Sequence, residues 1–214
     1  MTRRQLLLPT LRGWCVLAAL AIVAFTVFLK GAYPFLSPNS FREGGPLIVE
    51  CWGTDRLMKE AIRLHDEGHY GPILIPGGSI PSGQVFSQYH TLGEFSAAEI
   101  KALSNGRVRA EAIVVPDVQK DRTFACAMGA REWLEAHGGI PANVTVLSAG
   151  PHSRRSWLLY RKAFGKTTNV GIIATTPDDY DPARWWASND GFRVVVGEFI
   201  AYAYARLMFW RSGA

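Results

Sequence analysis

Residues 144–173 read VTVLSAGPHSRRSWLLYRKAFGKTTNVGII, and their alternation of apolar and mixed runs predicts the class of fold. Its two ends, 144–148 and 170–173, are short apolar runs, and such runs predict buried strands. Residues 153–164 between them predict a helix. Strands that are apolar throughout are typical of a parallel sheet, because helices cover both of its faces. The stretch therefore predicts a strand–helix–strand unit with parallel strands.

The same alternation of strand and helix extends toward the N-terminus. Apolar runs predict three more strands, at 47–51, 73–75 and 112–115, and helices are predicted over 55–67, 94–103 and 123–137. We therefore expect one α/β domain over 47–214, a Rossmann-like three-layer α/β/α fold with a mostly parallel five-stranded sheet.

An uncharged segment precedes this domain. Residues 13–29, GWCVLAALAIVAFTVFL, lie between Arg12 and Lys30 and would span about 26 Å as a helix, enough to cross a bilayer with snorkelling ends. Arg3, Arg4 and Arg12 precede the run, so the positive-inside rule places the N-terminus in the cytoplasm. The sequence predicts a cytoplasmic N-terminus at 1–12, a transmembrane signal anchor at 13–30 and a linker at 31–46. A cleaved signal peptide is the alternative, but residues 29–34, LKGAYP, make a poor cleavage site.

A second apolar stretch lies near the C-terminus. Residues 194–210, VVVGEFIAYAYARLMFW, carry Glu198 and Arg206 and follow Arg193. Each charge would cost about 2.5–3.5 kcal/mol at bilayer depth. We therefore expect a helix over 193–210 that packs on the domain and lies outside the bilayer.

Composition excludes some classes of function. The net charge is +5, but the basic residues form no long run, so nucleic acid is not an expected partner. Cys15, Cys51 and Cys126 form no CxxC motif and no Cys/His cluster, so neither a disulfide framework nor a metal site is expected. Cys51 and Cys126 are predicted to be buried free thiols.

Candidate site residues follow the predicted strands, because ligands of open parallel sheets bind at the carboxyl ends of the strands. The segments after the strands include 50–53, 76–79, 116–117, 148–152 and 175–178. The ligand-binding candidates are Gly77, Gly78, Ser79, Asp117, Thr123, Ser148, Arg154 and Arg155. His152 is the candidate acid/base, because imidazole titrates near neutral pH.

The two arginines stand at the start of a predicted helix, where free N–H groups and the helix dipole favour an anion. Either arginine could hold a phosphate or a carboxylate with two hydrogen bonds. Neighbours on a helix point about 100° apart, so only one can face the site, and we expect Arg154 because it is nearer the helix start. The alternative is that both arginines form surface ion pairs and His152 caps a turn.

Residues 146–165, VLSAGPHSRRSWLLYRKAFG, resemble the T-S-x-x-H-x-x-R-A type motif of the bacterial SanA/YdcF/ElyC family. Trp185, Trp186 and Ser188, followed by the helix with Glu198, extend the resemblance. The family's E-x-x-S-x-N-T-x-E-N stretch corresponds to 117–126, where an acid and Thr123 remain, so the chain resembles a divergent member of this YdcF-like family. The resemblance implies a Rossmann-like fold and a role in cell-envelope biogenesis, including the cell wall, or in maintenance of the envelope barrier. For a bacterial chain, the anchor then implies a single-pass protein of the inner (plasma) membrane with a periplasmic domain.

Four functions are compatible with these residues. The leading hypothesis is an envelope protein in the lipid bilayer whose strand-end pocket recognises an anionic, phosphorylated or lipid-linked envelope precursor. The second is a hydrolase or transferase that uses His152 as acid/base. The third is a binding module for a nucleotide-like small molecule such as S-adenosylmethionine, which is the one cofactor considered. The fourth is a non-catalytic scaffold whose Trp-rich C-terminal part contacts other membrane proteins.

Overall fold

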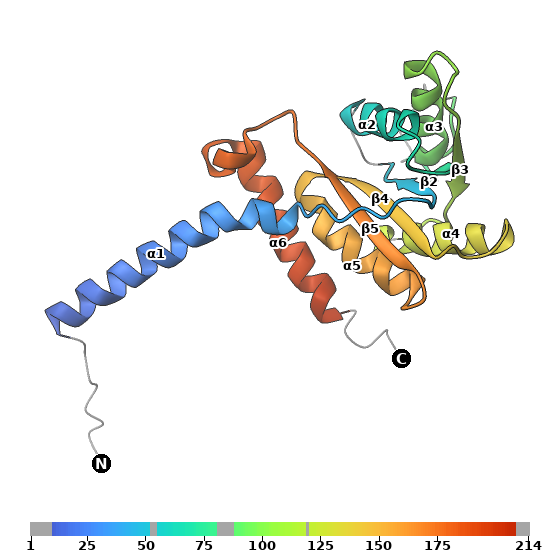
Figure 1. Ribbon diagram of the computed structural model, residues 1–214. Helices are drawn as coiled ribbons and strands as arrows, with labels where there is room; N and C mark the ends of the chain where they lie inside the picture. The colour runs from blue at the N-terminus through green and yellow to red at the C-terminus, as the bar shows by residue number, and fades with distance from the viewer. Residues whose placement is uncertain (1–9, 52–54, 81–87, 119, 209–214) are drawn as a thin grey trace.

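The computed structural model describes residues 10–51, 55–80, 88–118 and 120–208. Its centre is one five-stranded, all-parallel sheet with strand order β3-β2-β1-β4-β5 (Figure 1). The strands are β1 (Leu47–Val49), β2 (Ile73–Gly77), β3 (Ala110–Val114), β4 (Asn143–Ala149) and β5 (Asn169–Thr175). The expected five-stranded parallel sheet is confirmed.

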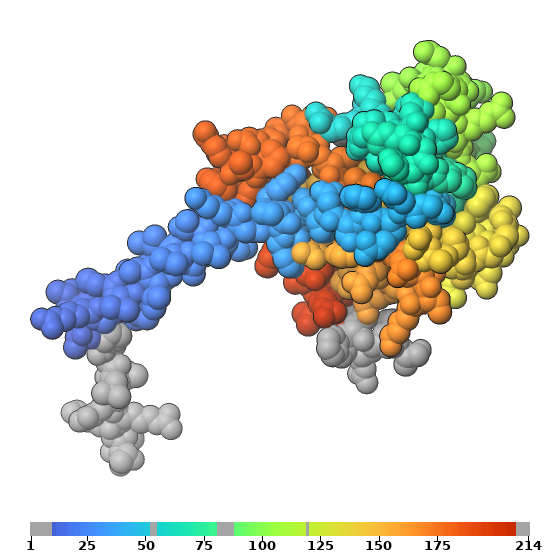
Figure 2. All heavy atoms as spheres, in the orientation of Figure 1, coloured from blue at the N-terminus to red at the C-terminus, as the bar shows by residue number. Residues whose placement is uncertain are grey.

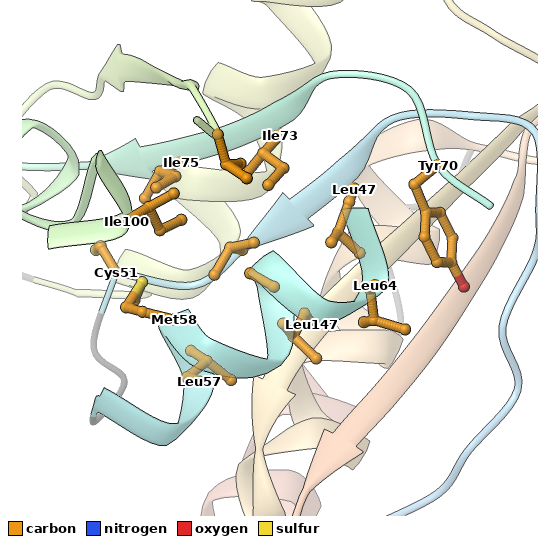
Figure 3. Close-up of a cluster of buried hydrophobic side chains, with 13 residues drawn as sticks. Leu47, Cys51, Leu57, Met58, Leu64, Tyr70, Ile73, Ile75, Ile100 and Leu147 are labelled. Atoms are coloured by element: carbon orange, nitrogen blue, oxygen red, sulfur yellow. The ribbon is translucent and has the colours of Figure 1, made fainter. Parts of the chain in front are cut away.

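Helices cover both faces of the sheet, which confirms the α/β fold. One face carries α2 (Asp55–Asp66) and α3 (Leu92–Leu103), and the other carries α4 (Arg122–Ala136) and α5 (Ser153–Phe164). Side chains alternate along β1: Leu47 and Val49 belong to the core on the α2 side, and Ile48 to the core on the α4 side. Figure 3 shows the first core, with Leu57 and Met58 of α2 beside the strands.

The strand order creates a switch point between β1 and β4. From β1 the chain proceeds outward to β2 and β3, and then crosses to the other side of β1 to form β4 and β5. At such a point the two crossover connections leave in opposite directions, so their loops separate at the carboxyl ends of the strands. The residues that follow β1 and β4 therefore lie where open α/β sheets bind ligands.

The N-terminal helix is longer than the predicted anchor. Helix α1 covers Leu11–Leu36 and is long enough and apolar enough to cross a membrane. Most of it projects from the body of the molecule (Figure 2). Its last turns contact the domain, where Ala32 and Leu36 are buried. The first six residues of the predicted linker therefore continue the helix.

The rest of the predicted linker lies against the sheet. Ser40 forms an antiparallel bridge with Ile172 of β5, and the Thr145 hydroxyl accepts a hydrogen bond from the Arg42 N–H at 2.8 Å. A Cβ atom at Gly171 would lie 2.7 Å from both the Arg42 nitrogen and the Ser40 oxygen. Gly171 thus permits the close approach of this segment, which connects α1 firmly to the domain.

The C-terminal helix forms as predicted but begins earlier, at Asn189. This helix, α6 (Asn189–Met208), follows the 3-10 segment η2 (Pro182–Ala187) and packs on α1 and α5 (Figure 1). Trp185 of η2 is almost fully buried, and its Nε1 donates a hydrogen bond to the Leu29 carbonyl at 2.8 Å. The Phe28 ring makes edge contacts with Trp185 and Phe199. These contacts hold the domain end of α1 against α6.

Candidate functional site

Glu50 is a buried carboxylate at the switch point. It directly follows β1, and only 5% of it is exposed. Its Oε1 accepts a hydrogen bond from the Ser156 hydroxyl at 2.7 Å and lies 3.5 Å from His152 Nε2. Burial by itself would raise the pKa of Glu50, but the charge of His152, together with the polar groups of His152, Ser148 and Ser156 beside it, lowers it overall. Glu50 is therefore ionised at neutral pH.

His152 lies between two carboxylates. It ends the short 3-10 segment η1 (Gly150–His152) that joins β4 to α5. Its Nδ1 lies 3.0 Å from Glu198 Oε1, and its Nε2 faces Glu50. Burial opposes protonation, but the two carboxylates outweigh it and raise the pKa of His152 to about 9. At neutral pH the side chain is an imidazolium, which is a proton donor.

Arg155 and Glu198 complete the cluster. Arg155 donates from Nε to Glu198 Oε2 at 2.9 Å and from Nη2 to Oε1 at 3.0 Å, a two-pronged ion pair between α5 and α6. Its Nη1 donates to the hydroxyl of Thr123, in the first turn of α4, at 3.2 Å. Burial would raise the pKa of Glu198, but hydrogen bonds from His152 and Arg155 lower it to about 2. Two carboxylates therefore balance two cations, and we call Glu50, His152, Arg155 and Glu198 the switch-point cluster.

The expectation that Arg154 faces the site is wrong. Arg154 donates from Nε to the Phe35 carbonyl at 2.6 Å, and its guanidinium lies 4.2 Å from the centre of the Phe35 ring. Arg155 faces the site instead, because it follows His152 by three residues and such residues share a helix face. That spacing was the available signal in the sequence.

A second group of predicted residues gathers at the ends of β2 and β3. The Ser79 N–H donates to Asp117 Oδ1 at 3.0 Å, and hydrogen bonding from Ser79 lowers the pKa of Asp117. A Cβ at Gly77 would lie 2.3 Å from the Gly93 nitrogen, so this glycine permits the first turn of α3 to contact β2. A Cβ at Gly78 would lie 3.2 Å from Asp117 Oδ1. These glycines therefore have a packing role within the fold.

Apart from Arg154, the predicted residues thus form two groups. Ser148, His152, Arg155 and Thr123 belong to the switch-point cluster or contact it, whereas 77–79 and Asp117 form the second group. No hydrogen bond or ion pair between described residues joins the two groups. Residues 52–53, which followed the first predicted strand, lie outside the described residues. Glu198 was not expected in the site, although a lone carboxylate within an apolar helix was a signal for it.

The two predicted buried thiols lie side by side. Cys51 follows Glu50, and Cys126 lies in α4; both are free and buried. The contact with Cys126 and burial both raise the pKa of Cys51. The expectation of buried free thiols is confirmed, and at neutral pH Cys51 is protonated and therefore a poor nucleophile.

The cluster retains hydrogen-bonding capacity. Glu50 Oε2 is buried and has no hydrogen-bond partner among residues 10–51, 55–80, 88–118 and 120–208, and the same holds for the Ser153 hydroxyl at the start of α5. A buried carboxylate oxygen without a donor is unfavourable by about 1–3 kcal/mol or more, so it favours any ligand or water that supplies an O–H or N–H. The site can therefore accept one hydrogen bond at Glu50 beside the acidic proton of His152.

Comparison with protein-family models, with curated proteins and with solved structures finds no match to this chain. The function is therefore inferred from the chemistry of the switch-point cluster and from its position beside the membrane-spanning candidate helix.

Proposed function

We propose that this chain is a membrane-anchored protein of the bacterial cell envelope. In this proposal the α/β domain lies outside the cytoplasm and recognises a phosphorylated or lipid-linked envelope precursor at the switch-point cluster. The observation that carries the proposal is the buried, unpartnered Glu50 oxygen beside the His152 imidazolium, at the ligand-binding edge of the sheet.

The arrangement fits a ligand with two kinds of polar group. A hydroxyl of the precursor would donate to Glu50 Oε2, and an acidic oxygen would accept from His152 or Arg155. The cluster is neutral as a whole, so it would select a ligand by paired hydrogen bonds instead of by net charge. The contacts of α1 with α6 place this site on a domain that is held beside the apolar helix, which suits a lipid-linked ligand.

A hydrolase or transferase is the second candidate, and the same pair of residues favours it. Glu50 is ionised and could accept a proton from an attacking water or hydroxyl, while His152 is protonated and could give a proton to a leaving group. In this version His152 acts as the acid and Glu50 as the base. Turnover of a phosphate ester or lipid-linked substrate would distinguish it from recognition alone.

Glu50→Gln is expected to abolish function while leaving the fold in place. The amide keeps the shape of the side chain but loses the negative charge that holds His152 protonated, and it presents donors where the ligand needs an acceptor. The measurement is complementation of a strain that lacks the gene, scored by its permeability to a large antibiotic that an intact envelope excludes. The variant should restore no more of the barrier than an empty vector.

Ile48→Val is the matched control for this experiment. Ile48 lies in β1, two residues before Glu50, and is fully buried, so the change should cost about 0.5–1.5 kcal/mol of stability through packing alone. It should complement fully at equal protein level. Full complementation by Glu50→Gln would refute the proposed role of the cluster.

Alkaline phosphatase fused after Ala214 should be highly active in a Gram-negative host, and a green fluorescent protein fused there should stay dark. The physical reason is the excess of arginines before the apolar helix, which retains the N-terminus in the cytoplasm. Reversed activities would contradict the proposed orientation. N-terminal sequencing of the mature protein that began after Lys30 would contradict the uncleaved anchor.

A further inference from the structure

A strongly basic groove lies on the outer side of α5. Its volume is about 990 Å³, and it lies among α5, the C-terminal half of α6 and the segment that includes Ser40 and Arg42. Its cationic lining residues are Arg42, Arg154, Arg161, Lys162, Lys166 and Arg206. No Asp or Glu of the described part of the chain lines it. We call it the basic groove.

The basic groove concentrates the net charge of the protein. The chain has 23 Lys and Arg against 18 Asp and Glu, a net charge of +5. The groove contains six of these cations and, among the described residues, no Asp or Glu. A concave surface lined by one sign of charge attracts counter-ions more strongly than scattered charges do. Its chemistry therefore fits an anion.

One end of the groove lies at the domain end of the apolar helix. Arg154 lines the groove and donates to the carbonyl of Phe35, in the last turn of α1. Tyr202 of α6 also lines it, and the Tyr202 ring makes an edge contact with the Phe35 ring at 5.5 Å between centres. If α1 spans the bilayer, lipid headgroups at this end of α1 lie within reach of the groove.

An aromatic side chain orders the cations in the groove. Trp157 is fixed because its Nε1 donates to the Val170 carbonyl at 2.7 Å. The guanidinium of Arg161 lies 5.3 Å from the centre of the Trp157 ring, at cation–π distance. A guanidinium that stacks on an aromatic ring keeps the N–H groups at its edge available, and these groups can donate hydrogen bonds to the oxygens of a phosphate.

We propose that the basic groove binds the phosphate of an anionic phospholipid headgroup from the leaflet at the C-terminal end of α1. This goes beyond the proposed function, because the switch-point cluster lies at the strand ends whereas the groove lies along the outer side of α5. Bound lipid would fix the orientation of the domain on the membrane. Substitutions in the basic groove should not affect the switch-point cluster, and substitutions in the cluster should not affect lipid binding in the groove. The two proposals can therefore be tested independently.

The test uses the full-length protein in a mild detergent, with lipid binding measured by native mass spectrometry. Phosphatidylglycerol should bind at a concentration about tenfold or more below that of phosphatidylcholine, because it is anionic, whereas the choline of phosphatidylcholine neutralises its phosphate, and several cations near an anionic headgroup each contribute. Arg161→Gln with Lys166→Gln should weaken phosphatidylglycerol binding about tenfold. Both side chains are exposed, so the melting temperature should change little. Raising the ionic strength should weaken binding to the unaltered protein as well.

Lys101→Gln with Arg109→Gln is the matched control. This variant removes the same charge from two exposed positions outside the groove. Lys101 lies in α3, which covers the other face of the sheet, and Arg109 directly precedes β3. Binding by this control should equal that of the unaltered protein. Equal binding of the two lipids, or unchanged binding by the groove variant, would overturn the proposal. Displacement of phosphatidylglycerol by an equal concentration of soluble glycerol phosphate would show that the groove takes a soluble phosphate and would overturn the lipid assignment.

Discussion

Replacing Glu198 with alanine is expected to lower the free energy of unfolding by about 3–5 kcal/mol, because it leaves buried positive charge without its partner. Glu198 accepts two hydrogen bonds from Arg155 and one from His152, and about four-fifths of its side chain is buried. The measurement is urea unfolding of the full-length protein in a mild detergent, followed by tryptophan fluorescence. The midpoint should fall while the slope stays constant.

Two further variants separate the ion pair from simple loss of a side chain. Glu135→Ala removes an exposed glutamate of α4 and should change stability by no more than about 0.5 kcal/mol. Adding Arg155→Ala to Glu198→Ala removes both members of the pair and should cost less than the sum of the two single changes. Equal stability of Glu198→Ala and Glu135→Ala would show that the pair contributes nothing to the fold.

Stability is expected to fall as the pH rises from about 6.5 to about 9, because His152 releases a proton more readily in the unfolded chain. The pKa of His152 is about 9 in the folded protein, against an ordinary value of 6.5. A group whose pKa is raised by folding stabilises the protein below its unfolded pKa and loses that contribution as the pH passes its folded pKa. The shift corresponds to about 3 kcal/mol. The measurement is the unfolding free energy at a series of pH values in this window.

His152→Gln supplies the comparison for the pH series. Glutamine has no titrating group, so the difference between the two proteins should shrink steadily toward pH 9. Other groups that titrate in the same window affect both proteins alike and cancel in the difference. A difference that stays constant from pH 6.5 to 9 would contradict the imidazolium assignment and, with it, the role of His152 as a proton donor.

Two residues of the switch-point cluster, His152 and Arg155, were candidates from the sequence, whereas Glu50 was only part of a candidate segment and Glu198 was not a candidate. Ser148, His152 and Arg155 were predicted to lie near a ligand because they follow a strand that ends at the binding edge. The prediction of Arg154 was wrong because it was based on the distance of each arginine from the start of the helix. The spacing from His152 decides which arginine lies on the same helix face as His152, and that arginine is Arg155. The glycines at 77 and 78 were predicted as ligand neighbours, but Gly77 permits contact with Gly93 of α3. A glycine in a sequence does not indicate which neighbour approaches it.

The helices, the strands and the class of fold follow from local patterns in the sequence. The spacing of apolar side chains within a run of residues distinguishes a buried strand from an amphipathic helix and from a transmembrane helix. The strands of 47–49 and 169–175 and the helix of 153–164 follow from that local pattern.

Which elements are neighbours depends on tertiary packing and could not be predicted from these local patterns. The strand order β3-β2-β1-β4-β5 places Glu50, at the end of β1, beside His152, more than a hundred residues later in the chain. The packing of α6 on α5 brings Glu198 to Arg155. Local periodicity carries no information about such pairings, because they depend on how distant apolar faces are buried against one another. For the same reason, the charges that define the candidate site became a cluster only in the folded chain.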